Sequence, residues 1–437
     1  MGKKRLRRAK FSSFDRRSNS EEPSSSTTSE RRTKSPRRNR IRSTILFLLF
    51  VVCPAISVIL YRRISSPSQS VSETDLPDVY RRGLVKADVN YRQVLDEHVK
   101  VSANVSRRQF ENSVLAYITP WNSKGYDLAK KFNSKLTHLS PVWYDLKSEG
   151  SSFVLDGRHN ADIGWISEIR MNSNAKILPR VVLEAMPMDF LTKKKQRKKV
   201  INLIVEECKK FDYDGIVLES WSRWAAYGVL HKPEMRMMAL QFIKQLGEAM
   251  HGVSTERNGE SLQLVYVIGP PYSDQLQSHD FGPEDLLGLS SAVDGFSLMT
   301  YDFSTPHNPG PNAPLKWIQS TLKLLLGSDN SGQGLARKIF VGINFYGNDF
   351  LQSGEGGGPI VGREYLSLLE QHRPILQWEK NSAEHFFIYL DNRRIKHVVF
   401  YPTLLSIAMR LEEARSWGAG ISIWEIGQGL DYFFDVL

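Results

Sequence analysis

Cysteine is scarce in this 437-residue chain, which contains only Cys53 and Cys208. Cys53 belongs to an apolar stretch near the N-terminus, so the part that follows has one thiol and cannot form an internal disulfide. The ten histidines show no zinc-ligand spacing, and the sequence has neither a Walker loop nor a G-x-S-x-G elbow. These absences exclude a disulfide-stapled scaffold and leave no motif for a metal or a cofactor, so we predict none.

An excess of one charge is also missing once the first 43 residues are set aside. Residues 1–43 hold 15 of the 58 Lys and Arg and 4 of the 47 Asp and Glu, whereas residues 44–437 hold 43 of each. The net charge of +11 therefore belongs to the N-terminal segment. Because the rest of the chain is balanced, it lacks the basic surface expected of a nucleic-acid-binding domain, and no nucleic-acid partner is predicted.

One uncharged stretch, "TILFLLFVVCPAISVILY" at residues 44–61, is long enough to cross a thin bilayer. As a helix it would span about 27 Å, which fits an early-secretory membrane. The basic residues before it place the N-terminus in the cytosol. A cleaved signal peptide is the alternative, although the polar lead is long for one. We predict a single-pass type II protein of the endomembrane system, with ER or Golgi favoured and a lysosomal, vacuolar or secreted location left open.

The chain is thus predicted to have four parts. Residues 1–43 form a basic, disordered cytosolic tail, because their Ser, Arg and Lys composition cannot bury enough apolar surface to fold. Residues 44–61 form the signal-anchor, residues 62–81 a flexible stalk and residues 82–437 the folded domain. The sequon Asn104-Val105-Ser106 is compatible with a lumenal position of that domain.

Within the folded part, short apolar runs alternate with helical patterns. The predicted strands are 114–118, 136–143, 177–184, 213–221, 262–269, 293–301, 338–346 and 418–425. The predicted helices between them include 125–135, 161–172, 192–210, 234–251, 314–326 and 404–417. Eight such units predict a (β/α)8 TIM barrel, with a doubly wound open sheet as the competing arrangement. The stretches "LQWEKNSAEHFFIYL" and "IKHVVFY" predict a small α+β insertion between strands seven and eight.

Active sites of such barrels lie at the carboxyl ends of the strands. In this sequence those ends are rich in aromatic residues and carry a few carboxylates, a combination that stacks on sugar rings and accepts hydroxyl hydrogen bonds. The predicted substrate-binding set is Tyr117, Trp121, Trp143, Glu219, Trp221, Met299, Tyr301, Asp302, Tyr346 and Trp424. For a single aromatic residue, capping of the core is an equally good interpretation; for the whole set, a saccharide cleft is the better one.

The motifs resemble those of family-18 glycoside hydrolases, the chitinase family. "YDGIVLESW" is similar to that family's D-G-x-D-x-D-x-E signature, "LMTYD" to its Met-x-Tyr-Asp segment, and "ISIWE" to the segment bearing its subsite tryptophan. "YITPWNSKGYDLA", "DGFSLMTYDFST" and "SIWEIGQGLDYFFD" resemble the chitinase domain-containing (stabilin-interacting chitinase-like) subgroup more closely. The resemblance runs from about Arg82 to the C-terminus and implies the same barrel fold and saccharide chemistry.

The signature also departs from the family. Matched residue by residue, Val217 and Glu219 replace its last two aspartates, and Trp221 stands at the catalytic glutamate. An indole is no general acid, and Glu219 lies two residues deeper, about 6.6 Å along a strand. The resemblance therefore implies binding of chitin or other N-acetylated oligosaccharides without chitinase activity, and leaves other enzymatic activity uncertain.

Two alternatives stay open. One is a glycoside hydrolase with a relocated acid, for which Glu219, Asp302 or Glu425 are candidates; Glu219 and Asp302 are the candidate catalytic residues. The other is a scaffold protein with a vestigial cleft and an unknown protein partner.

Overall fold

The computed structural model describes residues 77–150, 152–271, 275–327 and 333–437. The predicted tail, the predicted membrane segment (44–61) and most of the predicted stalk lie outside these residues. Within the described ranges, no helix is both long and apolar enough to cross a membrane. The first described helix, α3 (Asp78–Arg81), covers the end of the segment predicted as a stalk.

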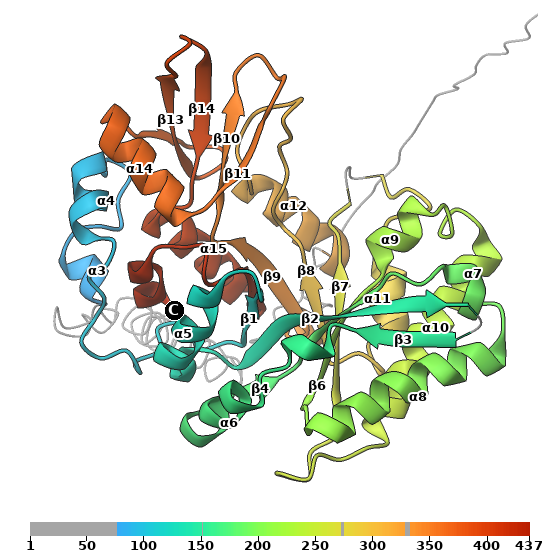
Figure 1. The fold of residues 1–437 in the computed structure, drawn as a ribbon. Coiled ribbons are helices and arrows are strands. Elements are labelled where there is room, and N and C mark those ends of the chain that lie inside the picture. The colour runs from blue at the N-terminus through green and yellow to red at the C-terminus, as the bar shows by residue number, and fades with distance from the viewer. Residues whose placement is uncertain (1–76, 151, 272–274, 328–332) are drawn as a thin grey trace, which may run out of the picture. The chain divides into compact units, whose positions relative to one another are not determined.

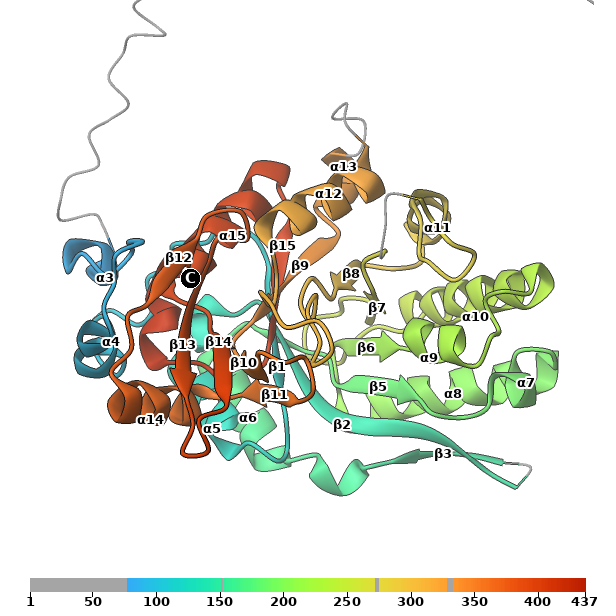
Figure 2. The ribbon, with the colours of Figure 1, turned by 90° about the horizontal axis from the view of Figure 1, so that it is seen from above.

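A closed barrel of eight parallel strands forms the centre of the fold (Figures 1 and 2). The strand order is β1-β15-β9-β8-β7-β6-β5-β2, and the pairing of β1 with β2 closes the ring. The strands are β1 (Val114–Ile118), β2 (His138–Glu149), β5 (Arg180–Leu183), β6 (Gly215–Glu219), β7 (Gln263–Ile268), β8 (Gly295–Leu298), β9 (Ile339–Asn344) and β15 (Gly420–Trp424). Each corresponds to a predicted strand, so the TIM barrel is confirmed and the open sheet is wrong.

Helices follow the strands and pack on the outside of the barrel (Figure 2). The longer ones are α5 (Ser123–Lys131), α6 (Ile163–Asn172), α8 (Lys194–Phe211), α10 (Pro233–His251), α12 (Leu315–Leu326) and α15 (Leu404–Trp417). In α8, Val200, Ile204 and Cys208 recur at helical spacing and are buried. This spacing places one apolar stripe against the barrel and leaves the lysines of the helix exposed.

The ends of some elements differ from the sequence-based expectation. β2 continues to Glu149 and pairs with β3 (Ser152–Asp156), a hairpin that was not predicted. β6 ends at Glu219, and Trp221 already begins the short helix α9 (Trp221–Ala226), so the predicted strand 213–221 is too long. β6 begins at Gly215, with φ of 149°, where a Cβ atom would lie 2.0 Å from the Gln263 carbonyl oxygen. The glycine therefore permits the close pairing of β6 with β7.

The predicted insertion is confirmed and lies between β9 and α15. Its antiparallel sheet has the order β11-β10-β14-β13-β12, and α14 (Gly362–His372) packs beside it (Figure 1). The strands are β10 (Gly347–Leu351), β11 (Gly357–Ile360), β12 (Gln377–Glu379), β13 (Glu384–Leu390) and β14 (Lys396–Phe400). Because β10 follows β9 almost directly, this sheet stands at the carboxyl end of the barrel strands.

Candidate functional site

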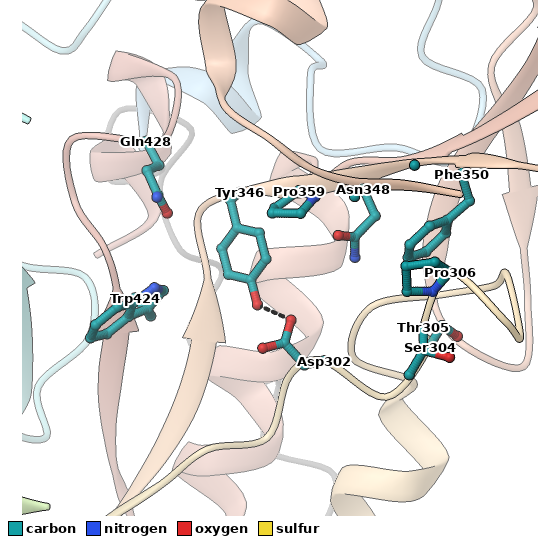
Figure 3. A pocket seen from close by; sticks show the side chains of 12 residues that line it. Asp302, Ser304, Thr305, Pro306, Tyr346, Asn348, Phe350, Pro359, Trp424 and Gln428 are labelled. Atoms are coloured by element: carbon teal, nitrogen blue, oxygen red, sulfur yellow. Dashed lines mark hydrogen bonds between the residues drawn. The ribbon is translucent and has the colours of Figure 1, made fainter. Parts of the chain in front are cut away.

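Two cavities open at the carboxyl ends of the barrel strands. Cavity 1 has a volume of about 450 Å³ and lies between the barrel and the insertion (Figure 3). Its lining residues are Asp302, Ser304, Thr305, Pro306, Tyr346, Asn348, Phe350, Gly357, Gly358, Pro359, Trp424 and Gln428. Cavity 2, of about 350 Å³, is lined by Trp221, Ser222, Ala225, Gly269, Pro270, His279, Asp280, Phe281, Met299, Tyr301, Asp302, Phe303 and Trp317. Asp302 lines both, so the two cavities meet at this residue.

Asp302 follows β8 and adopts a left-handed backbone conformation, with φ of 60°. Its backbone N–H donates to Oδ1 of Asn312 at 2.7 Å, which fixes the turn. Its carboxylate accepts a hydrogen bond from the Tyr346 hydroxyl (Figure 3). Burial raises the pKa of Asp302, and the hydrogen bond from Tyr346 lowers it by a smaller amount. The result is a cleft-lining acid, shared by both cavities, whose pKa is raised from the ordinary value of aspartate.

Glu219 ends β6 and is engaged by Arg180 of β5. The Arg180 Nε atom donates to Oε2 of Glu219 at 2.7 Å, and a second guanidinium nitrogen donates to the same oxygen. The two side chains are 14 % and 15 % exposed, so the ion pair is largely desolvated. The Arg180 guanidinium also lies 5.3 Å from the centre of the Trp424 ring. Arg180 was not predicted from the sequence, because nothing in "LPRVVLE" indicates that this arginine would form an ion pair with Glu219 of the next strand.

Trp221 packs against the segment that contains His279 and Phe281. Ser220, which precedes α9, has φ of −154° and ψ of −28°, so the backbone leaves the extended conformation here. The alternation of side chains between the two faces of β6 therefore stops before Trp221. The indole Nε1 of Trp221 donates to the His279 carbonyl oxygen at 2.9 Å, and its ring packs edge-on against Phe281 at 5.1 Å. The Arg236 guanidinium lies 4.9 Å from the ring centre. Trp221 thus forms part of the wall of cavity 2 and does not continue the strand beyond Glu219.

Five of the other predicted residues divide between the cleft and the core. Trp424 and Tyr346 line cavity 1, and Tyr301 and Met299 line cavity 2. Tyr117 lies under Trp424, with ring centres 5.1 Å apart, and its hydroxyl donates to Oγ of Ser297 at 2.8 Å. Tyr117 therefore supports the floor of the cleft from inside the barrel and lines neither cavity.

Three further predicted residues lie apart from the cleft. Trp121 is 70 % exposed and lines neither cavity. Trp143 is buried among the outer helices, where its Nε1 donates to the Tyr126 hydroxyl at 2.7 Å, so its placement corrects the expectation of a cleft residue. Glu425 is fully buried and accepts hydrogen bonds from Nδ2 of Asn122 at 2.6 Å and from the backbone N–H of Gly427 at 3.0 Å. Burial raises its pKa to about 6.

The structure adds cleft residues that the sequence did not single out. Asn348 and Phe350 come from β10, and Gln428 follows β15. The stretch "FYGNDF" at residues 345–350 was the available signal, because it overlaps the end of predicted strand seven and continues from it at the cleft. The insertion was predicted without any residue in the cleft, and the structure shows that its strand β10 contributes to the wall of cavity 1.

A buried network joins Asp302 to the insertion. Asn312, whose Oδ1 accepts from the backbone of Asp302, donates its own backbone N–H to Glu384 of β13 at 3.0 Å. Glu384 also accepts from the backbone of Ala313 at 2.7 Å and from Arg410 of α15 at 3.1 Å. This chain of contacts links the loop after β8, the insertion sheet and the outer helix α15.

The sequence model of glycosyl hydrolases family 18 matches residues 113–429 of this chain. The chain therefore belongs to this family. An uncharacterized glycosylase, YvbX, from Bacillus subtilis (strain 168) is 22 % identical over 250 residues, which cover 56 % of this chain and 67 % of that protein.

Within the described residues, no group of three or more His, Cys, Asp or Glu side chains is arranged to hold a metal ion.

Solved structures share the fold. A chitinase from Chromobacterium violaceum ATCC 12472 superposes with a TM-score of 0.61 at 19 % identity, over 74 % of this chain and 98 % of that one. The spore cortex-lytic enzyme SleL of Bacillus cereus gives 0.60 at 17 % identity, over 77 % and 75 %. A GH18 chitinase from Cycas revoluta in complex with (GlcNAc)3 gives 0.58 at 15 % identity, over 74 % and 97 %.

Proposed function

We propose that this chain binds chitin-type or other N-acetylated oligosaccharides in the cleft formed by cavities 1 and 2, without hydrolysing chitin. One observation carries the proposal. Glu219, the acid at the end of β6, forms a largely buried ion pair with Arg180. A carboxylate committed to a guanidinium accepts hydrogen bonds and is poorly suited to protonate a leaving oxygen.

The resemblance of "YDGIVLESW" to the family signature supports the same conclusion. In that match, Trp221 stands where family-18 enzymes carry the catalytic glutamate. Its indole N–H is already used by the His279 carbonyl, and its ring forms a wall of cavity 2. The signature's leading aspartate, Asp214, has a structural role here: it accepts from the Ile177 backbone and from Arg257, each at 2.8 Å.

The cleft retains what saccharide binding needs. Trp424 offers a half-buried aromatic face on which the apolar face of a sugar ring can stack. Asp302 offers carboxylate oxygens to hydroxyl or amide N–H groups from either cavity. The volumes of the two cavities fall within the range typical of small-ligand sites, about 300–1,000 Å³.

Calorimetric titration with triacetylchitotriose tests the proposal. Replacement of a stacking aromatic at the centre of a site costs about 2 kcal/mol or more, so Trp424→Ala is expected to weaken binding at least about 30-fold. Trp121→Ala is the matched control, since this exposed tryptophan lines neither cavity. Equal losses in both variants, or no binding by the wild type to any member of a glycan array, would contradict saccharide binding in this cleft and favour the scaffold alternative with a protein partner.

The second candidate is a hydrolase with a relocated acid, and one observation favours it. Burial raises the pKa of Asp302, as is typical of carboxyl groups that act as general acids. Turnover assays on a broad glycan panel distinguish the candidates. Turnover that disappears in Asp302→Asn or Glu219→Gln while ligand affinity survives would replace the binding-only proposal.

Membership of the chitinase domain-containing subgroup, anchoring through residues 44–61 and a lumenal orientation are part of the same proposal and rest on the sequence. The exposed Asn104 of the sequon gives a direct test. In a lumenal protein, Asn104→Gln and glycosidase treatment both lower the apparent mass, and carbonate extraction leaves the wild type in the membrane fraction. An unglycosylated, extractable protein would contradict both the anchor and the orientation.

A further inference from the structure

Asn348 presents a buried amide to cavity 1 without using its donor. The residue is 4 % exposed, and among the described residues its Nδ2 atom has no hydrogen-bond partner. It lines cavity 1, and Figure 3 shows its side chain between Tyr346 and Phe350. A buried donor left unpaired costs stability, so its presence at a ligand-sized cavity points to an acceptor that arrives with the ligand.

The strand geometry explains why this amide faces the cavity. Side chains alternate along β10, so Asn348 and Phe350 share the cavity face. Asp349, between them, faces the other side of the sheet, where its carboxylate accepts from Tyr389 at 2.6 Å and contacts Nδ1 of His397 at 2.9 Å. The neighbouring β11 is drawn close by Gly357, with φ of 95°, where a Cβ atom would lie 2.1 Å from the Asp349 carbonyl oxygen. β10, which carries Asn348, therefore pairs with β11 on one edge and with β14 on the other, and this pairing fixes the position of its backbone.

The rest of the wall indicates which acceptor fits. Asp302 is the one charged side chain among the described residues lining cavity 1, so a carboxylate or sulfate substituent would be repelled. Phe350, Pro306 and Pro359 offer apolar surface beside the amide. A neutral group with an acceptor oxygen, a small apolar end and a donor for Asp302 satisfies all of these features, and an acetamido group has this chemistry.

We propose that Asn348 determines specificity by donating its Nδ2 hydrogen to the carbonyl oxygen of an acetamido substituent on the bound saccharide. The methyl group of that substituent packs against Phe350 and the prolines. The inference rests on the proposed saccharide-binding function and assigns to the insertion the selection of N-acetylated over plain glucan chains.

Calorimetry with two probes tests the assignment: triacetylchitotriose, and cellotriose, which carries hydroxyl groups in place of the acetamido groups. The wild type should prefer triacetylchitotriose. Asn348→Leu keeps the size of the side chain but removes the donor, and it should weaken triacetylchitotriose binding about tenfold while leaving cellotriose affinity unchanged. Asn348→Asp should also lose the preference, because it places an acceptor opposite the carbonyl.

Thermal unfolding separates a ligand-binding amide from a structural one. Because Nδ2 of Asn348 has no partner within the described protein, Asn348→Leu should leave the Tm unchanged or raise it by about 1–2 °C. The matched control is Asn344→Leu: this amide is equally buried but donates to the Tyr346 carbonyl oxygen at 2.7 Å, so its removal should lower the Tm.

The outcomes separate this inference from the function on which it rests. An unchanged preference in Asn348→Leu, with Trp424→Ala still weakening binding, would overturn the role of Asn348 and leave saccharide binding intact. A Tm lowered as much as in Asn344→Leu would assign the amide a structural role and overturn it as well. A wild type that binds neither probe would refute the proposed function, and the specificity assignment would fail with it.

Discussion

Removing Arg180 should destabilise the barrel through the charge that it leaves behind. Arg180 and Glu219 are 15 % and 14 % exposed and share a charge-assisted contact between β5 and β6. Loss of one partner of a fully buried ion pair costs about 3–5 kcal/mol, because the remaining charge is desolvated without compensation. Since both side chains retain some contact with water, we expect about 2–3 kcal/mol for Arg180→Met.

A double-mutant cycle separates the ion pair from the contact of the Arg180 guanidinium with the Trp424 ring. Arg180→Met and Glu219→Leu should each be destabilising, whereas the double variant should be no less stable than either single variant, which corresponds to a coupling energy of about 2–3 kcal/mol. At about 2.1 cal/mol/K per residue of unfolding entropy, each single variant lowers the Tm by about 3 °C in a domain of this size. The measurement is thermal unfolding by calorimetry, supported by urea titration.

Additive effects of the two substitutions would refute the reasoning. They would mean that Glu219 does not depend on Arg180 and that its carboxylate is free for another role in the cleft. The functional counterpart is equally direct: a structural Glu219 makes Glu219→Gln less stable but leaves glycan turnover at the level of the wild type.

Three further outcomes follow from the geometry. Trp221→Glu should not create chitinase activity, because position 221 faces His279 and Arg236 in the wall of cavity 2; turnover of chitotetraose by this variant would contradict that placement. Desolvation raises the pKa of Asp302 from the ordinary value of aspartate, so its carboxylate becomes protonated earlier on acidification than a solvated aspartate does. Triacetylchitotriose affinity should then fall on acidification in calorimetric titrations, and an identical pH profile in Asp302→Asn would exclude this carboxylate as the acceptor. The pKa of Glu425 is about 6 in the folded state against 4.5 in the unfolded chain, so protonation favours folding, and this contribution to stability is gained as the pH falls from about 6 to about 4.5. Urea titrations should show up to about 2 kcal/mol from this residue, absent in Glu425→Gln; an unchanged profile in that variant would assign the effect elsewhere.

The barrel could be predicted because its signals are local and repeated. Each strand is an apolar run followed by a helix with apolar residues at helical spacing, as in α8, and the regular alternation favours a parallel closed sheet. The insertion was also predictable, because its strands interrupt that alternation.

The site was harder to predict, because its decisive contacts join distant segments. The sequence places Glu219 and Trp221 on one face of a strand, but the turn at Ser220 ends the strand between them. It also treats Trp143 and Trp424 alike, although one faces the outer helices and the other the cleft. Which side of a barrel strand a residue occupies depends on register and bulges, and β2 has such an irregularity between Val142 and Tyr144.

The contacts from Asp302 through Asn312 and Glu384 to Arg410 have a consequence for exchanging the insertion between related proteins. The loop after β8 and the insertion sheet share one buried carboxylate, so neither can shift without disturbing the other. Suppose that the insertion of a relative replaced this one and brought no carboxylate at the position of Glu384. Arg410 and the backbone of Asn312 would then lose their shared buried partner, and the loop that carries Asp302 would lose its support. An exchange of the insertion must therefore keep Asp302, Asn312, Glu384 and Arg410 together, although these four positions come from three segments of the chain.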